Sequence, residues 1–192
     1  MKKIMLGVVV PAVILVAGFY AFNAYIYNEK QAPATASFKD AEYRIDGTVV
    51  RLKDGFAETE AAPGSASKIT TRYFGNDYAV DLNDDGKEDV VFILTQETGG
   101  TGIFYYVVAA ISTERGYVGS DGYLLGDRIA PQTIGTSPNP RHTGVIVANY
   151  ADRPESDPMS SQPSVGRSAY LKLDAASMMW GIVAPDFEGE SR

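Results

Sequence analysis

The sequence contains no cysteine, which excludes disulfide bonds, thiolate metal ligands and cysteine nucleophiles. It also contains a single histidine, His142, so any histidine-based general base must be this residue. His142 lies in a proline-rich loop, residues 137–143, with no nearby serine or carboxylate motif that would activate it. We therefore expect His142 to be a solvated loop residue and the protein not to be an enzyme.

Basic residues are also scarce relative to acidic ones. The chain has 17 Lys and Arg against 24 Asp and Glu, a formal net charge of −7. An acidic surface repels the phosphate backbone, so we predict no nucleic-acid partner. Such a surface suits cations or basic proteins instead.

Residues 81–89 read DLNDDGKED, the ligand pattern of a calcium-binding loop. Oxygen-bearing side chains recur at alternate positions, a glycine then permits a sharp turn, and a backbone carbonyl and one more carboxylate follow. The predicted ligands of Ca²⁺ are Asp81, Asn83, Asp85, Lys87 through its carbonyl, and Asp89. The alternative is an acidic turn before a strand. Repulsion among five acidic residues in nine positions favours a bound cation.

The loop is not an EF-hand, because its twelfth position is Phe92 instead of glutamate and an apolar segment, residues 90–94, follows it directly. Over about a dozen residues it resembles the calcium sites of FG-GAP and similar extracellular β-repeats, in which a strand follows the loop. The motif occurs once, so no propeller is predicted. Without a bidentate ligand at position twelve, we expect a structural site with an affinity on the order of 10⁻⁴–10⁻³ M.

The longest apolar run, residues 4–22, follows Lys2 and Lys3 and is long enough to cross the hydrocarbon core of a bilayer. The leading lysines favour a cytoplasmic N-terminus in a single-pass cell membrane protein, with the remainder extracytoplasmic. The predicted parts are a cytoplasmic stub 1–3, a transmembrane anchor 4–27, a linker 28–39, an extracytoplasmic β domain 40–183 and a flexible tail 184–192. A cleaved signal peptide is the alternative for the N-terminal segment.

Beyond the linker the pattern is that of β-strands, with glycine and proline in nearly every gap. The candidate strands are residues 43–52, 56–60, 69–74, 78–80, 90–95, 103–111, 117–125, 144–149 and 168–173. Residues 90–94 and 105–111 are continuously apolar, as expected of central strands buried on both faces. We predict a mostly β single domain, an antiparallel sandwich or open barrel, with one helical turn within residues 38–44.

Two Asp-Arg pairs end apolar strands: Asp127 with Arg128, and Asp152 with Arg153. They can form a buried ionic network or a pocket for an anionic ligand, and we favour the network. The two aspartates are also the candidate carboxylate pair of a hydrolase. The glycine-rich residues 99–102 precede a strand, which favours a hairpin turn over a phosphate site.

Six segments in order resemble an uncharacterised family of bacterial exported proteins: residues 62–67, 81–89, 99–109, LLGDRIAPQ at 124–132, VANYADR at 147–153, and 158–163. The resemblance spans residues 40–174 and implies an exported, often membrane-anchored or wall-associated domain with no assigned activity. We predict a calcium-stabilised binding module of the cell envelope, whose partner is an envelope polymer or a protein. The alternatives are a carboxylate-based envelope hydrolase and an inhibitor or accessory factor of basic wall-degrading enzymes.

Overall fold

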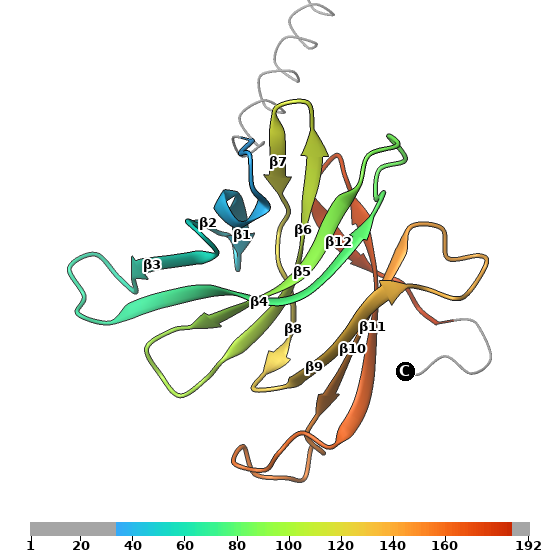
Figure 1. The fold of residues 1–192 in the computed structure, drawn as a ribbon. Coiled ribbons are helices and arrows are strands. Elements are labelled where there is room, and N and C mark those ends of the chain that lie inside the picture. The colour runs from blue at the N-terminus through green and yellow to red at the C-terminus, as the bar shows by residue number, and fades with distance from the viewer. Residues whose placement is uncertain (1–33, 186–192) are drawn as a thin grey trace, which may run out of the picture. The chain divides into compact units, whose positions relative to one another are not determined.

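The computed structural model describes residues 34–185 (Figure 1). Its elements are a 3₁₀ turn η1 (Phe38–Asp40) and the strands β1 (Glu42–Ile45), β2 (Thr48–Arg51), β3 (Phe56–Glu60), β4 (Lys68–Val80), β5 (Asp89–Glu97), β6 (Phe104–Thr113), β7 (Gly116–Gly119), β8 (Tyr123–Asp127), β9 (Ala130–Thr136), β10 (Val145–Asp152), β11 (Val165–Asp174) and β12 (Met179–Ile182). The predicted anchor lies outside the described residues. Within them, no helix has the length and apolar character needed to span a membrane.

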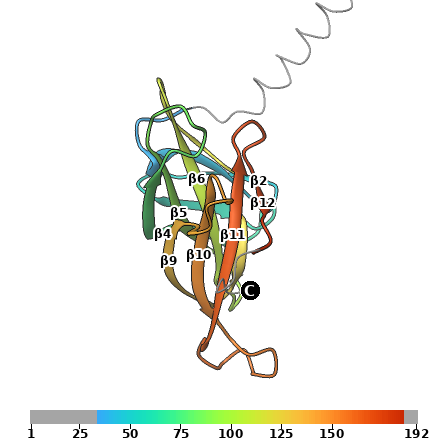
Figure 2. The same cartoon turned by 90° about the vertical axis from the view of Figure 1, so that its right-hand side faces the viewer.

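The strands form antiparallel sheets, which confirms the mostly β prediction. A six-stranded sheet has the order β3-β4-β5-β6-β7, with β8 also paired to β6, and a four-stranded sheet has the order β12-β11-β10-β9 (Figure 2). The two sheets do not close into a barrel. Where β4 and β9 lie side by side, side chains join them: Asn76 Nδ2 donates to Gln132 O at 3.0 Å, and the Tyr78 and Thr136 hydroxyls are 2.7 Å apart.

The central strands β5 and β6 are buried on both faces, as their continuous apolar runs predict, because alternate side chains point to opposite faces. Toward the four-stranded sheet, one cluster contains Val91, Ile93, Val107, Ala109 and Ile111 together with Ile146, Ala148, Leu171 and Leu173 of β10 and β11. The opposite cluster contains Phe92, Leu94, Tyr106, Val108 and Ala110. The six-stranded sheet is therefore the middle layer of the fold.

The chain before β3 covers the second face of this middle layer. Phe38 of η1 and Tyr43 of β1 pack on Phe92, with ring centroids 5.2 Å and 5.5 Å from it. Thr35 pairs with Tyr117 of β7, so within the described residues the chain contacts the sheet from residue 35 onward. The helical turn predicted within residues 38–44 is present as η1.

Some strand boundaries were predicted wrongly. The candidate strand 43–52 is a hairpin, because Asp46 and Gly47 have φ values of 49° and 77°, which suit the tight turn between β1 and β2. The candidates 69–74 and 78–80 are one strand, β4, whose register shifts around Gly75. The strands β9 and β12 were missed. Strand β9 contains a proline and a glycine, and β12 has only four residues.

Candidate functional sites at the two ends of the sheets

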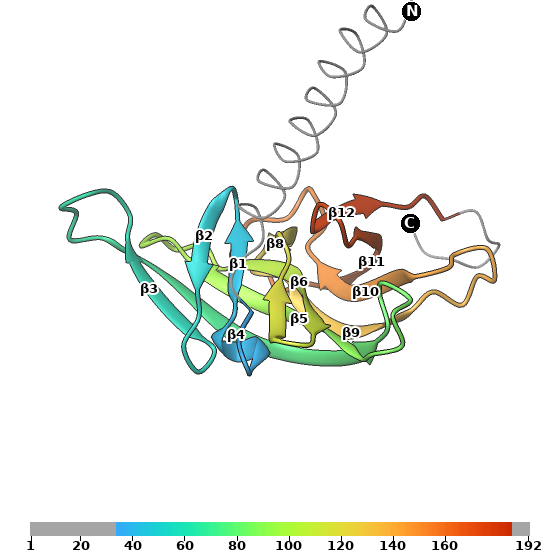
Figure 3. The same ribbon diagram turned by 90° about the horizontal axis from the view of Figure 1, so that it is seen from above.

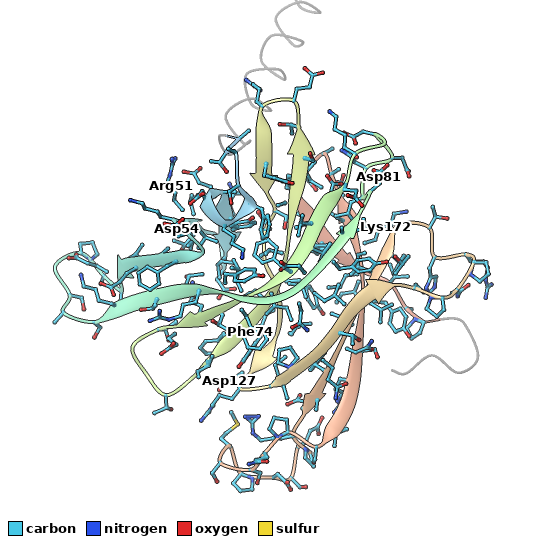
Figure 4. The ribbon with its side chains drawn as sticks, viewed as in Figure 1. Arg51, Asp54, Phe74, Asp81, Asp127 and Lys172 are labelled. Carbon is cyan, nitrogen blue, oxygen red and sulfur yellow. The ribbon has the colours of Figure 1, made fainter. Side chains whose placement is uncertain are left out.

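The acidic loop, residues 81–89, joins β4 to the start of β5 (Figure 4). Its side-chain oxygens turn inward to its own backbone amides. Asp81 accepts hydrogen bonds from the amides of Asp85 (3.2 Å) and Gly86 (2.8 Å), and Asn83 Oδ1 accepts from the same Asp85 amide at 3.2 Å. Gly86 has a φ of 80°, which confirms the sharp turn predicted there. Two predicted ligand oxygens therefore meet at one amide.

Asp89, the last predicted ligand, is fully buried at the base of this loop. Its carboxylate accepts hydrogen bonds from the amides of Leu82 (2.9 Å) and Ser112 (2.7 Å), and so ties the loop to β6. Burial raises the pKa of Asp89, and the charges of Asp85 and Asp81 add to the rise, against the opposing effect of the two amides. The three carboxylates are thus close enough to repel one another.

The donor atoms of this loop fit a hard cation such as Ca²⁺, because all are oxygens and each carboxylate oxygen has a second lone pair. Asp85 also accepts a hydrogen bond from the Lys87 amide at 2.9 Å. Among residues 34–185, however, no three His, Cys, Asp or Glu side chains gather closely enough to hold a metal ion. A calcium ion would have to draw Asp81, Asp85 and Asp89 together, and the site stays a prediction.

The Asp-Arg segments lie beyond the other end of β5, where three connections meet. Asp127 accepts a hydrogen bond from the Ile103 amide of the β5–β6 loop at 2.8 Å and pairs with Arg128 at 2.9 Å. Asp152 accepts from the Arg153 amide at 2.7 Å, so its carboxylate turns toward its own chain. The two pairs therefore do not form one symmetrical ionic network.

Arg153 is the buried centre of this end, with only 7% of its surface exposed. Its guanidinium donates to the carbonyls of Asp127 and Arg128, at 2.9 Å for the shortest contact, and to the Met159 carbonyl at 3.4 Å. The group thus binds the β8–β9 turn to the β10–β11 loop. Together with the hydrogen bond from the Ile103 amide to Asp127, it holds the β5–β6, β8–β9 and β10–β11 connections together. We name these three connections the loop end.

The geometry of Asp127 does not favour a glycosidase-like acid. Burial acts to raise its pKa, but the hydrogen bonds from Arg128 and the Ile103 amide, with the charge of Arg153, outweigh burial, and the net pKa is lowered. A general acid needs a raised pKa at neutral pH. Asp127 is instead held as an anion that positions the loop.

His142 is not the solvated loop residue that the sequence predicted: it is buried, and Ser137 and Asn139 contact its ring. The distances are 2.8 Å from Ser137 Oγ to Nδ1 and 3.2 Å from Asn139 Nδ2 to Nε2. Asn139 Oδ1 accepts from the Arg141 amide at 3.0 Å, so its NH₂ group faces the ring, Nε2 accepts and Nδ1–H donates to Ser137. A histidine that donates to the serine does not act as the base that activates it.

The contacts among Ser137, Asn139 and His142 hold the β9–β10 loop against the outer face of the four-stranded sheet. The His142 ring meets Tyr170 edge-on, with centroids 6.0 Å apart, and Tyr170 belongs to a small apolar cluster with Val145 and Val147. The prediction of a solvated histidine failed because proline and asparagine in the loop indicate a turn but do not show which surface it covers.

Replacing His142 by alanine is therefore expected to lower the free energy of unfolding by about 2 kcal/mol, because it removes two buried hydrogen bonds and a ring contact. Thr143→Ala, at an exposed position of the same loop, is the matched control and should leave stability within about 0.5 kcal/mol of the parent. Chemical denaturation of both variants measures the difference. Equal midpoints for the two variants would contradict the structural role of His142.

Comparison of the chain with protein-family models, with curated proteins and with solved structures finds no match. The resemblance to bacterial exported proteins thus stays a prediction. The functional argument rests on the residues of this chain.

Proposed function

We propose that the chain is a non-enzymatic, membrane-anchored extracytoplasmic module that binds a component of the cell envelope and that a calcium ion in residues 81–89 stabilises. The observation that carries this proposal is that the two candidate sites lie at opposite ends of β5, each fixed by a buried charged residue. The acidic loop precedes β5 and is tied to β6 through buried Asp89, while the loop end follows β5 and is fixed by buried Arg153.

A scaffold of this kind suits binding, because rigid strands position loops that can contact a partner. The loop end also exposes apolar surface: Met159, in the segment that Arg153 fixes, is about half exposed. The groups that were candidates for catalysis are used differently. His142 donates to Ser137, and the pKa of Asp127 is lowered. These contacts support an interaction module over the hydrolase alternative.

The absence of cysteine makes the membrane topology directly testable, because a single introduced cysteine is the sole target of a maleimide label. Glu114→Cys lies at an exposed turn between β6 and β7, and Lys3→Cys lies in the predicted cytoplasmic stub. We expect a membrane-impermeant maleimide to label Glu114→Cys in intact cells and Lys3→Cys only after permeabilisation. The chain should also remain in the membrane fraction after a high-salt wash.

The reverse labelling pattern would place the β domain in the cytoplasm and contradict the proposal. Release of the chain by the salt wash, with Glu114→Cys still labelled from outside, would show that residues 4–27 do not anchor the protein.

A further inference from the structure

A row of residues crosses one face of the six-stranded sheet in register. Phe56 of β3 pairs with Arg72 of β4, Arg72 pairs with Thr95 of β5, and Thr95 pairs with Tyr105 of β6. Residues paired in this way point to the same face of a sheet. With strands about 4.8 Å apart, Phe56 and Tyr105, three strand spacings from each other, lie about 14 Å apart across the sheet.

Aromatic side chains on this face are exposed to solvent. Phe56 is 39% exposed and Phe74 is 45% exposed. The Phe74 ring meets Tyr105 edge-on with centroids 5.4 Å apart, and the Arg72 guanidinium lies 4.8 Å from the Phe56 ring centre. We name Phe56, Phe74 and Tyr105 the aromatic row. In Figures 1 and 3, β3 and the adjoining half of β4 extend away from β9–β12, so the second sheet does not cover this part of the face.

The position of Phe74 is set by an irregularity of β4. Tyr73 pairs with Leu94 and Gly75 pairs with Ile93, so Phe74 is an extra residue in its strand. Gly75 and Asn76 have φ values of 126° and 60°, and the Asn76 side chain is bonded to Gln132 O of β9. A bulge bends its strand and re-aims the side chain of the extra residue, and bulges are over-represented at sheet edges and next to active sites.

Most charges around the aromatic row are paired, and Glu58 of β3, on the same face as Phe56 and Glu60, adds one further carboxylate. Arg72 lies 3.9 Å from Glu97, Lys68 lies 3.6 Å from Glu60, and Asp127 lies 2.9 Å from Arg128. Self-paired charges give little net attraction to a polyanion or a polycation. The paired side chains are partly exposed, so their carboxylate and guanidinium groups remain accessible. Such planar groups can form two hydrogen bonds at once to neighbouring hydroxyl groups of a ligand.

We propose that the aromatic row is a binding platform for a neutral glycan. A glycan has apolar ring faces and polar hydroxyl groups, and the row offers aromatic rings and flanking charged side chains. The apolar C–H faces of sugar rings pack on aromatic rings, and the sugar hydroxyl groups bond to the flanking charged side chains. The row is long enough for a short run of sugar rings. This inference rests on the proposed function and names its ligand class.

The test is a titration of the full-length chain in detergent micelles with a tetrasaccharide of β-1,4-linked N-acetylglucosamine, followed by ligand-observed NMR. We expect Phe74→Ala to weaken binding about tenfold, and Phe74→Tyr, which keeps the ring, to stay within about threefold of the parent. Ile182→Ala removes an apolar side chain that is 73% exposed on β12 and should not change binding. Melting temperatures of the three variants report whether each is folded.

Lack of binding by the parent chain, or equal loss in Phe74→Ala and Ile182→Ala, would overturn the proposal. Binding of an apolar peptide without binding of the tetrasaccharide would assign the aromatic row to a protein partner and also overturn it. The labelling experiment separates this inference from the proposed function. Outside labelling of Glu114→Cys without glycan binding refutes the glycan platform alone, and glycan binding by a chain labelled only after permeabilisation refutes the topology alone.

Discussion

Arg153→Ala is expected to lower the free energy of unfolding by about 3 kcal/mol. The guanidinium is buried and serves the carbonyls of Asp127, Arg128 and Met159 at once. Its removal leaves these acceptors without a charged donor and frees the β10–β11 loop from the β8–β9 turn. For a chain of this length the melting temperature should fall by roughly 10 °C.

Arg128→Ala is the matched control, because Arg128 lies in the same cluster but its side chain is partly exposed. A partly exposed ion pair contributes at most about 1 kcal/mol, so this variant should melt close to the parent. Arg153→Lys should recover little of the lost stability, since one ammonium group does not reproduce the fork that reaches several carbonyls. If the two alanine variants lose equal stability, Arg153 is not the group that holds the loop end.

The main layer of the fold could be predicted because its signals are local and strong. Residues 90–94 and 105–111 are continuously apolar, and glycines at 99–102 separate them, which leaves a hairpin of two buried strands as the natural solution. Strand β12 carried no such signal. Its four residues gain their stability from pairing with β11, a partner that periodicity does not reveal.

The sites show the same distinction between local and long-range information. The acidic loop was found because its oxygens follow one another in the sequence, whereas the role of Arg153 depends on carbonyls 25 and 26 residues away. The aromatic row was missed for a related reason, because it combines residues of three strands. A signal for Phe74 was nevertheless present: the glycine and asparagine that follow it interrupt a strand pattern and indicate a bulge.

Calcium at about 100 times its dissociation constant is expected to add about 2.7 kcal/mol to the free energy of unfolding, a shift of several degrees in the melting temperature. The physical reason is the repulsion within the acidic loop. Asp89 is buried, and the charges of Asp81 and Asp85 disfavour its ionised form. A divalent cation placed among these groups would replace that repulsion with attraction.

The decisive variant is Asp81→Asn/Asp85→Asn, measured with chelator and with calcium at about 10–100 mM, which is about 100 times the expected dissociation constant. Asparagine at position 85 keeps the oxygen that accepts from the Lys87 amide, and asparagine at position 81 keeps one of the two oxygens that accept from the Asp85 and Gly86 amides. Both substitutions remove a charge, so each protein is compared with and without calcium to separate loss of the ion from loss of one amide bond. We expect the calcium shift to disappear in this variant and to persist in Asp157→Asn, an exposed carboxylate of the β10–β11 loop. Magnesium should give a smaller shift, since it demands a more regular octahedral shell. If calcium leaves the melt of the parent unchanged, the amides of Leu82 and Ser112 alone stabilise Asp89, and residues 81–89 are an acidic turn.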